Sequence, residues 1–344
     1  MKQPFKDMVL APEGVEDIVK TAMRRFKRTE VKKVKISLVR LKKKEYARIA
    51  TLYDYTSERL RKIYTSFPRI RDLHPFYREL VTLIVDVDEL RVNLAHLKAV
   101  VEVLNNIKRD LMRKVKFAAN IGELSKIRKE AIGRYFSVLK SIDDDLRAIR
   151  IAQMKLIKLQ DINPYTPTIV VAGPPNVGKS SFIRAVSRAR PEVREYPFTT
   201  KSLTVGHVLA NSGTKIQVMD TPGLLDRPLT DRNPIEKQAI VAIKHLAKVI
   251  LFILDPTETC GYTYDYQLRV LIEIRKEFRN IPMIVALNKI DLIEDHESLD
   301  RARERLLRVV EDAEITGIYE MSIEERVNVN TVLEALLRLI GSIH

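Results

Sequence analysis

Gly173, Gly178, Lys179 and Ser180 stand at the spacing G-x-x-x-x-G-K-S. In this pattern the backbone N–H groups of a glycine-rich turn surround phosphate oxygens, and the lysine ammonium reaches the terminal phosphates. The pattern indicates a phosphate-binding loop only where it lies between a strand and a helix. An apolar run over 167–172 predicts the strand that precedes it. The segment therefore predicts a phosphate-binding loop. Its predicted contacts are Gly173, Pro174, Pro175, Asn176, Val177, Gly178, Lys179, Ser180 and Ser181.

A second group of candidate ligands follows the apolar run 215–219. An aspartate at the carboxyl end of such a strand, beside phosphates, can hold the shell of a Mg²⁺ ion, and a glycine three residues on can offer its N–H to a γ-phosphate. We expect Ser180 and Asp220 to be metal ligands. The predicted contacts in this second box are Asp220, Thr221, Pro222, Gly223 and Leu224.

A third box predicts which base is bound. Residues 288–291 follow the predicted strand 282–287 and read Asn-Lys-Ile-Asp. The Asp291 carboxylate can accept two hydrogen bonds from N1 and the exocyclic amine of guanine, and adenine lacks that pair of donors. Ser322 and Ile323 stand where such domains close over the base, although Ser-Ile-Glu departs from the usual Ser-Ala-Lys. The predicted ligands are GTP and GDP, with base contacts from Asn288, Lys289, Ile290, Asp291, Ser322 and Ile323.

Length and composition indicate two domains. The chain has 344 residues, 45% of them hydrophobic, which is enough for a core in each domain. The single cysteine, Cys260, excludes a disulfide framework. Residues 1–20 contain no apolar leader, and the longest apolar run, 249–254, suits a central strand and is too short for a membrane span. We expect a cytoplasmic protein.

The basic charge is confined to the first half. Residues 1–160 hold 37 Lys/Arg and 20 Asp/Glu, a net charge of +17, and residues 161–344 have a net charge of −2. Pro164 and Pro167 punctuate the boundary between them. We predict a basic helical domain over 1–160 and a P-loop GTPase domain over 161–344.

Helix-forming residues dominate the first half, and their apolar positions repeat at helical spacing. Four helices are expected, over 15–26, 38–67, 80–115 and 124–159, and they predict a four-helix bundle. For the second half, alternating strands and helices predict a mostly parallel sheet with helices on both faces and one antiparallel hairpin at Ser212-Gly213.

The segment 24–44 contains eleven Lys/Arg and one acid, Glu30. Such self-repulsion is tolerated when a polyanion neutralises it, which favours RNA. A second basic cluster is Lys108, Arg109, Arg113, Lys114 and Lys116. Two alternatives stay open: a solvated helix surface, and an anionic membrane. Four tyrosines that interleave with the basic residues are expected either to stack on unpaired bases or to belong to the core. These are Tyr46, Tyr53, Tyr55 and Tyr64.

Two further segments give the chain a family resemblance. Tyr196-Pro-Phe-Thr-Thr200, together with the first two boxes, resembles the Obg-like branch of translation-factor-related GTPases. Residues 254–262, Leu-Asp-Pro-Thr-Glu-Thr-Cys-Gly-Tyr, are similar to a signature of the nucleolar GTP-binding protein (Nog) family within that branch. The helical first half also resembles that family, so the resemblance covers nearly the whole chain. Because the chain ends at His344, it resembles the short archaeal form.

The resemblance implies several roles. Thr200 is expected to join Ser180 and Asp220 on Mg²⁺ when GTP is bound, with Thr199 as its neighbour at the nucleotide. Leu224 replaces the glutamine that orients water in Ras-like enzymes, so slow hydrolysis is expected. Asn176 occupies the position at which Era-like GTPases coordinate K⁺; the alternative is that asparagine simply suits a tight loop. The expected catalytic residues are Lys179, Thr200 and Asn176.

The resemblance also implies a role and partners. The favoured function is GTP hydrolysis by an assembly factor of the large ribosomal subunit, whose partners are rRNA, the subunit precursor and ribosomal or assembly proteins. No membrane partner is expected, and the isolated protein is expected to be a monomer. The alternative is a signalling or membrane-associated GTPase whose bundle binds a protein or an anionic lipid.

Overall fold

The computed structural model describes residues 3–30, 38–159, 162–195, 202–210, 213–221, 223–228, 231–310 and 314–341. The chain divides into two compact units. One is a helical unit of residues 4–72 and 84–159, and the other is an α/β unit that contains residues 73–83 and 160–344. The predicted domain boundary at 160/161 falls on residues outside the described ones and stays a prediction.

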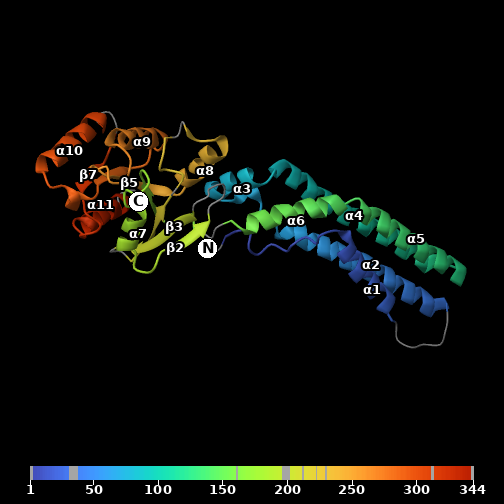
Figure 1. The fold of residues 1–344 in the computed structure, drawn as a ribbon. Helices are drawn as coiled ribbons and strands as arrows, with labels where there is room; N and C mark the ends of the chain where they lie inside the picture. Colours follow the sequence, from blue (N-terminus) through green and yellow to red (C-terminus); the bar gives the residue numbers. More distant parts are fainter. Residues whose placement is uncertain are drawn as a thin grey trace. The chain divides into compact units, whose positions relative to one another are not determined.

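The helical unit consists of long helices that lie side by side (Figure 1). Its contacts run mainly between α2 and α4, with α1 on α2 and with α5 and α6 on α4. The helices are α1 (Val15–Arg28), α2 (Leu38–Ser66), α4 (Val87–Phe117), α5 (Ile121–Lys140) and α6 (Asp143–Ile157).

Two of the four predicted helices are wrong in extent, because each is divided into two helices in the structure. The stripe predicted over 80–115 breaks at Asp86, whose side chain accepts hydrogen bonds from Asp88 N and Glu89 N and so begins a new helix. The stripe predicted over 124–159 breaks after Lys140, and the next helix opens with the acidic run 143–145, which favours a helix N-terminus. Apolar spacing continues across both breaks, so spacing alone could not reveal them.

The apolar stripes form the core of the helical unit. Leu97, Leu104 and Leu111 of α4 are fully buried, as are Ile49 and Leu60 of α2. Two tyrosines belong to this core, and their hydroxyl groups form hydrogen bonds inside it. Tyr53 is fully buried and donates its hydroxyl to Ala131 O at 2.8 Å, while Thr56 and Tyr135 share a hydrogen bond of 2.8 Å. Of the four interleaved tyrosines, Tyr53 is therefore a core residue, whereas Tyr46 is 47% exposed.

The α/β unit contains a seven-stranded sheet in the order β2-β3-β4-β1-β5-β6-β7. Strands β1, β4, β5, β6 and β7 pair in parallel, and β2 and β3 add two antiparallel pairings. The fold class is confirmed, but the single predicted hairpin becomes two, since β2 has no sequence signature of its own. The strands are β1 (Thr168–Ala172), β2 (Glu192–Glu195), β3 (Ser202–Leu209), β4 (Lys215–Asp220), β5 (Ala247–Leu254), β6 (Met283–Leu287) and β7 (Gly317–Glu320).

Helices cover both faces of this sheet (Figure 1). On one face Phe182 of α7 and Leu336 of α11 pack with the alternate residues Val249, Leu251 and Ile253 of β5. The intervening β5 residues Ile250 and Phe252 are buried as well, so the central strand is apolar from Val249 to Leu254. The helices are α7 (Lys179–Val186), α8 (Pro234–Lys244), α9 (Tyr264–Glu277), α10 (His296–Val310) and α11 (Val329–Gly341).

One helix that precedes α4 in the sequence belongs to the α/β unit. Most of α3 (Pro75–Ile84) lies in that unit, where the buried Tyr77 donates its hydroxyl to Ile162 O at 2.7 Å. Asn163 O in turn accepts a hydrogen bond from Gln217 of β4 at 3.0 Å. The segment that leads into β1 is therefore tied to α3 as well as to the sheet.

Candidate nucleotide-binding site

The loop between β1 and α7 has a backbone that only certain residues adopt without strain. Gly173 and Gly178 have φ angles of 135° and 108°, and Asn176 has 62°. A side chain at Gly173 would collide with the backbone oxygen of Ile253, and a Cβ at Gly178 would lie 2.5 Å from Asn288 Nδ2. The glycine spacing thus matches both the left-handed turns and the close approach of β5 and residue 288. Asparagine tolerates the left-handed region better than most residues, which suits position 176.

Lys179 begins α7 and folds back over this loop. Its ammonium donates to Gly173 O at 2.8 Å and to Pro174 O at 2.6 Å, and the residue is only 7% exposed. A buried cation held by two carbonyl groups keeps its charge at the centre of the loop. It can therefore attract phosphate oxygens brought to the same place.

Ser180 and Asp220 meet beside the lysine. The serine hydroxyl donates to Asp220 Oδ2, and the aspartate is 1% exposed. Its other oxygen, Oδ1, is buried and has no hydrogen-bond partner among the described residues. Burial raises the pKa of Asp220, and the nearby Lys179 charge and the Ser180 hydrogen bond only partly oppose it. Two oxygen atoms of different residues are thus brought together at the carboxyl end of β4.

Asp226 and Arg232, which follow the second box, form a buried ion pair that the sequence did not predict. Asp226 accepts the Gly223 N–H at 2.8 Å and pairs with Arg232 at 3.0 Å. The Arg232 side chain is fully buried and also donates to Gly223 O. The N–H expected to meet a γ-phosphate is therefore held by a carboxylate in this structure. Asp226 stands only three residues after Gly223, but this spacing does not by itself predict that the carboxylate turns back to accept the Gly223 N–H.

The third box lies against the phosphate loop through Asn288. Its side chain donates to Val177 O at 2.8 Å and accepts Ile323 N–H at 3.2 Å. Asn288 therefore joins the phosphate loop to the segment after β7. Ser322 is buried there, and its hydroxyl accepts the N–H of Glu325 at 3.0 Å.

Six of the nine predicted phosphate-loop residues line one hollow of about 390 Å³, together with Asp220 of the second box. Asp291 is exposed and does not line it. Thr199, Thr200 and Pro222 lie outside the described residues. The hollow is lined by Pro175, Asn176, Gly178, Lys179, Ser180, Ser181, Asp220 and Asp226.

Comparisons with known proteins match both halves of the chain. Residues 5–163 match the model of the NOG1 N-terminal helical domain, and residues 234–291 match that of nucleolar GTP-binding protein 1 (NOG1). An uncharacterized protein of Methanocaldococcus jannaschii is 36% identical over 297 residues, which cover 85% of this chain and 82% of that protein. The chain belongs to the NOG1 family.

Named members of the NOG1 family are longer than this chain. The nucleolar GTP-binding protein 1 of Drosophila melanogaster is 36% identical over 284 residues, which cover 83% of this chain and 43% of that protein. The chain thus spans less than half the length of that relative. A crystal structure from Plasmodium falciparum that bears the family's name aligns with a TM-score of 0.46 at 34% identity, over 54% of this chain and 91% of that one.

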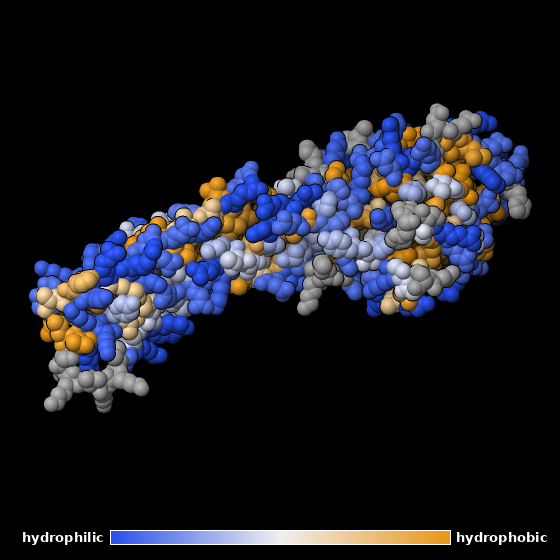
Figure 2. All heavy atoms as spheres, turned by 180° about the vertical axis from the view of Figure 1, so that it is seen from behind, coloured by the Kyte–Doolittle hydropathy of each residue, from blue (hydrophilic) through white to orange (hydrophobic). Residues whose placement is uncertain are grey.

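The NOG1-type helical unit has a largely hydrophilic surface on the face seen in Figure 2. Within the basic segment 24–44, the residues that make no ion pair in the described part of the chain include Arg24, Lys27, Arg28 and Lys43. The second predicted cluster is partly neutralised, since Lys108 pairs with Asp54 at 2.5 Å and Lys114 with Glu130 at 2.7 Å. The first segment therefore retains more uncompensated charge than the second.

None of the helices in the described ranges has the length and apolar content that crossing a bilayer requires. The names of the relatives place those proteins in the nucleolus. For this chain, a cytoplasmic location stays a prediction.

Proposed function

We propose that this chain binds GTP and GDP, hydrolyses GTP, and acts as an assembly factor on the large ribosomal subunit. The main support is the hollow in which Lys179, Ser180 and Asp220 converge on the phosphate loop. A lysine, a hydroxyl and a carboxylate in that arrangement suit the β- and γ-phosphates of a nucleoside triphosphate and its metal ion. The family name and the Asn-Lys-Ile-Asp box support guanine as the base.

The same residues fit Mg²⁺. Asp220 Oδ1 is buried and has no partner in the described part of the chain, and Asp220 Oδ2 already accepts the hydrogen bond of the Ser180 hydroxyl. Oxygen ligands of this kind suit a hard divalent cation. Ser180 and Asp220 would hold the ion, with Thr200 as the third ligand from the sequence. When bound, Mg²⁺ would neutralise negative charge on the β- and γ-phosphates.

Hydrolysis should be slow without an activator. Leu224 is fully buried and aliphatic, so it cannot orient an attacking water molecule. Charge on the transition state would then be stabilised by Lys179. If a K⁺ ion is bound by Asn176, that ion would add a second positive charge. The chemistry therefore depends on charge at the phosphates more than on an activated nucleophile.

The net charge of +17 in residues 1–160 supports rRNA as the partner of the helical unit. Such charge lowers the free energy of binding to a polyanion by releasing counterions. Docking on the large-subunit precursor would place GTP hydrolysis on the particle, where it can time release of the factor.

Two measurements test the proposal. Lys179→Ala and Ser180→Ala should each abolish tight GTP binding, whereas Arg184→Ala, on the exposed side of α7, should leave it unchanged. The parent protein should also co-sediment with large-subunit particles, and RNase treatment should remove it from them. GTP affinity that survives both site substitutions would refute the nucleotide site. Retention on RNase-treated particles or on anionic vesicles would refute rRNA docking and favour the signalling or membrane alternative.

A further inference from the structure

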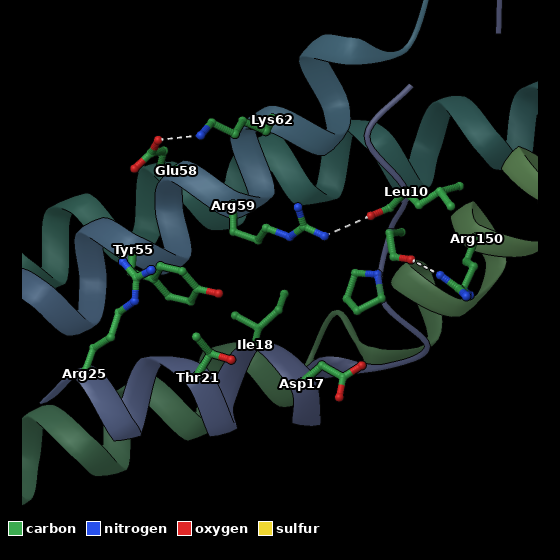
Figure 3. A pocket seen from close by; sticks show the side chains of 12 residues that line it. Leu10, Asp17, Ile18, Thr21, Arg25, Tyr55, Glu58, Arg59, Lys62 and Arg150 are labelled. Carbon is green, nitrogen blue, oxygen red and sulfur yellow. Dashed lines mark hydrogen bonds and ion pairs between the residues drawn. The ribbon is translucent and has the colours of Figure 1, made fainter. Parts of the chain in front are cut away.

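The helical unit contains a polar pocket of about 620 Å³ that the proposed GTPase site does not use. Figure 3 shows its walls: the segment 10–12, one side of α1, one side of α2, and Arg150 of α6. Arg59 donates to Leu10 O at 3.2 Å, and Arg150 donates to Ala11 O at 2.7 Å. These two bonds fasten the N-terminal segment to the helices and shape the pocket. Its volume lies within the range of about 300–1,000 Å³ that is usual for small-ligand sites.

The positive charges in this pocket differ in how far they are already neutralised. Lys62 pairs with Glu58 at 2.7 Å, and Arg150 lies 3.4 Å from Glu13. Arg59 makes no ion pair in the described part of the chain, and only one of its five donors is used. A half-buried guanidinium with unused donors is suited to donate two parallel hydrogen bonds to a phosphate group.

An aromatic ring, that of Tyr55, lines the same pocket as Arg59. The Arg25 guanidinium lies 4.3 Å from the centroid of the Tyr55 ring, and the Tyr55 hydroxyl points into the pocket (Figure 3). A stacked arginine–tyrosine pair can continue its stack onto a nucleobase. Asp17 and Thr21 of α1 line the opposite side and can accept hydrogen bonds from amino or imino groups of a base.

We infer that this pocket receives one unpaired ribonucleotide of the RNA that the helical unit binds. The phosphate group meets Arg59, the base lies against the Tyr55–Arg25 stack, and Asp17 faces the base edge. An acidic peptide would bring its carboxylates close to Asp17 and Glu58, and those acidic side chains carry no flat ring to stack. A base-paired strand keeps its bases inside the helix and cannot present one here. The inference rests on the proposed rRNA docking and adds to it a preference for single-stranded RNA.

Binding of a fluorescent oligouridylate and of a blunt-ended RNA duplex of equal length, measured by anisotropy, tests this inference. Arg59→Ala should weaken oligouridylate binding about tenfold, the usual scale for losing a charge-assisted contact together with its stacked base. Arg61→Ala removes the same charge two residues along α2, at an exposed position outside the pocket, and serves as the matched control. The two substitutions should weaken duplex binding equally.

A second variant separates occupation of the pocket from charge and folding. Thr21→Trp fills the pocket and leaves every charge in place, so it should reduce oligouridylate binding as Arg59→Ala does and leave duplex binding unchanged. Equal effects of Arg59→Ala and Arg61→Ala on oligouridylate, or full oligouridylate affinity in Thr21→Trp, would overturn the pocket inference alone. A parent protein that binds neither RNA would overturn rRNA docking and the pocket inference together.

Discussion

The ammonium group of Lys289 lies 2.8 Å from Oδ2 of Asp255, a carboxylate with no solvent exposure at the end of β5. The same carboxylate accepts the N–H groups of Thr257 and Cys260 at 3.0 and 2.8 Å. Cys260 O then accepts Asn176 Nδ2 at 3.4 Å. Asp255 therefore connects the predicted guanine box to the phosphate loop through the segment that resembles the family signature.

Asp255→Asn should weaken GTP binding about tenfold, because Lys289 and the segment 257–260 lose the charge that positions them. It should also lower the free energy of unfolding by about 2 kcal/mol, less than for a fully buried pair because the Lys289 side chain is 22% exposed. Fluorescent-nucleotide titration and urea unfolding measure the two effects. Asp265→Asn, at an exposed carboxylate of α9, is the control. Unchanged nucleotide affinity would show that Asp255 only stabilises its loop.

The pH dependence of that stability has a definite sign. Burial alone would raise the pKa of Asp255, but hydrogen bonds from Lys289 and Thr257 outweigh it and hold the pKa below its usual value. A carboxyl whose pKa is lower in the folded state contributes stability above its unfolded pKa of about 3.9, and this is lost as pH falls through the folded value. The difference in unfolding free energy between parent and Asp255→Asn should stay constant near neutral pH and shrink only in acid. A difference that shrinks near pH 6 would contradict this assignment.

Asp220→Asn should stabilise the protein and impair its chemistry. Burial raises the pKa of Asp220, so its ionisation disfavours the folded state as pH rises from about 3.9 through the folded pKa. Removing that charge should raise the unfolding free energy by about 1 kcal/mol at neutral pH when nucleotide and Mg²⁺ are absent. Mg²⁺-dependent GTP affinity should fall at least about tenfold. Unfolding in EDTA and titration with Mg²⁺ measure the two changes; a destabilised variant would contradict the electrostatic account.

Asp291→Asn should exchange guanine for xanthine selectivity, because the acceptor that faces the base N–H becomes a donor. The loss of two charge-assisted hydrogen bonds should lower GTP affinity at least about a hundredfold. Glu294→Gln, a nearby exposed acid, should leave it unchanged. Competition between GTP and XTP gives the answer, and retained GTP preference would remove Asp291 from the base-reading role.

GTP turnover should be several-fold faster in K⁺ than in Na⁺ if Asn176 holds a monovalent ion. The φ angle of 62° makes Asn176→Gly a better variant than alanine, since glycine keeps the left-handed backbone without strain. Asn176→Gly should remove the difference between the two salts. Equal rates for the parent in K⁺ and Na⁺ would leave Asn176 as a loop residue that orders the Cys260 carbonyl.

Reversing Arg40, Lys42, Lys43 and Lys44 to Glu should weaken binding to large-subunit rRNA and flatten its salt dependence. Each phosphate contact that is lost should reduce the slope by about 0.7–0.9. Lys42 also donates to Lys116 O at 3.0 Å, so thermal unfolding of the variant must accompany the binding data. GTP binding should be unaffected. Parent-like rRNA affinity and slope would identify this stretch as a solvated helix surface.

The sequence alone determined the fold class and the contents of the nucleotide boxes. Gly173, Gly178 and Lys179 could be read directly because a phosphate loop imposes φ angles, close contacts and a charge at fixed spacing, and no distant partner is needed to recognise it. The apolar period likewise predicted the buried helix faces. It did not show the breaks at Asp86 and Ser141, since a cap depends on local hydrogen bonds and leaves the apolar spacing intact.

Only the tertiary structure decided which groups meet across the sheet. Asp255 and Lys289 are 34 residues apart in the sequence, and neighbouring parallel strands β5 and β6 bring them together. Asp226 and Arg232 pair because the chain after β4 turns back. Arg59 of α2 donates to Leu10 O, 49 residues away in the sequence. Such contacts depend on strand order and on the packing of remote segments, so neither composition nor spacing along the chain specifies them.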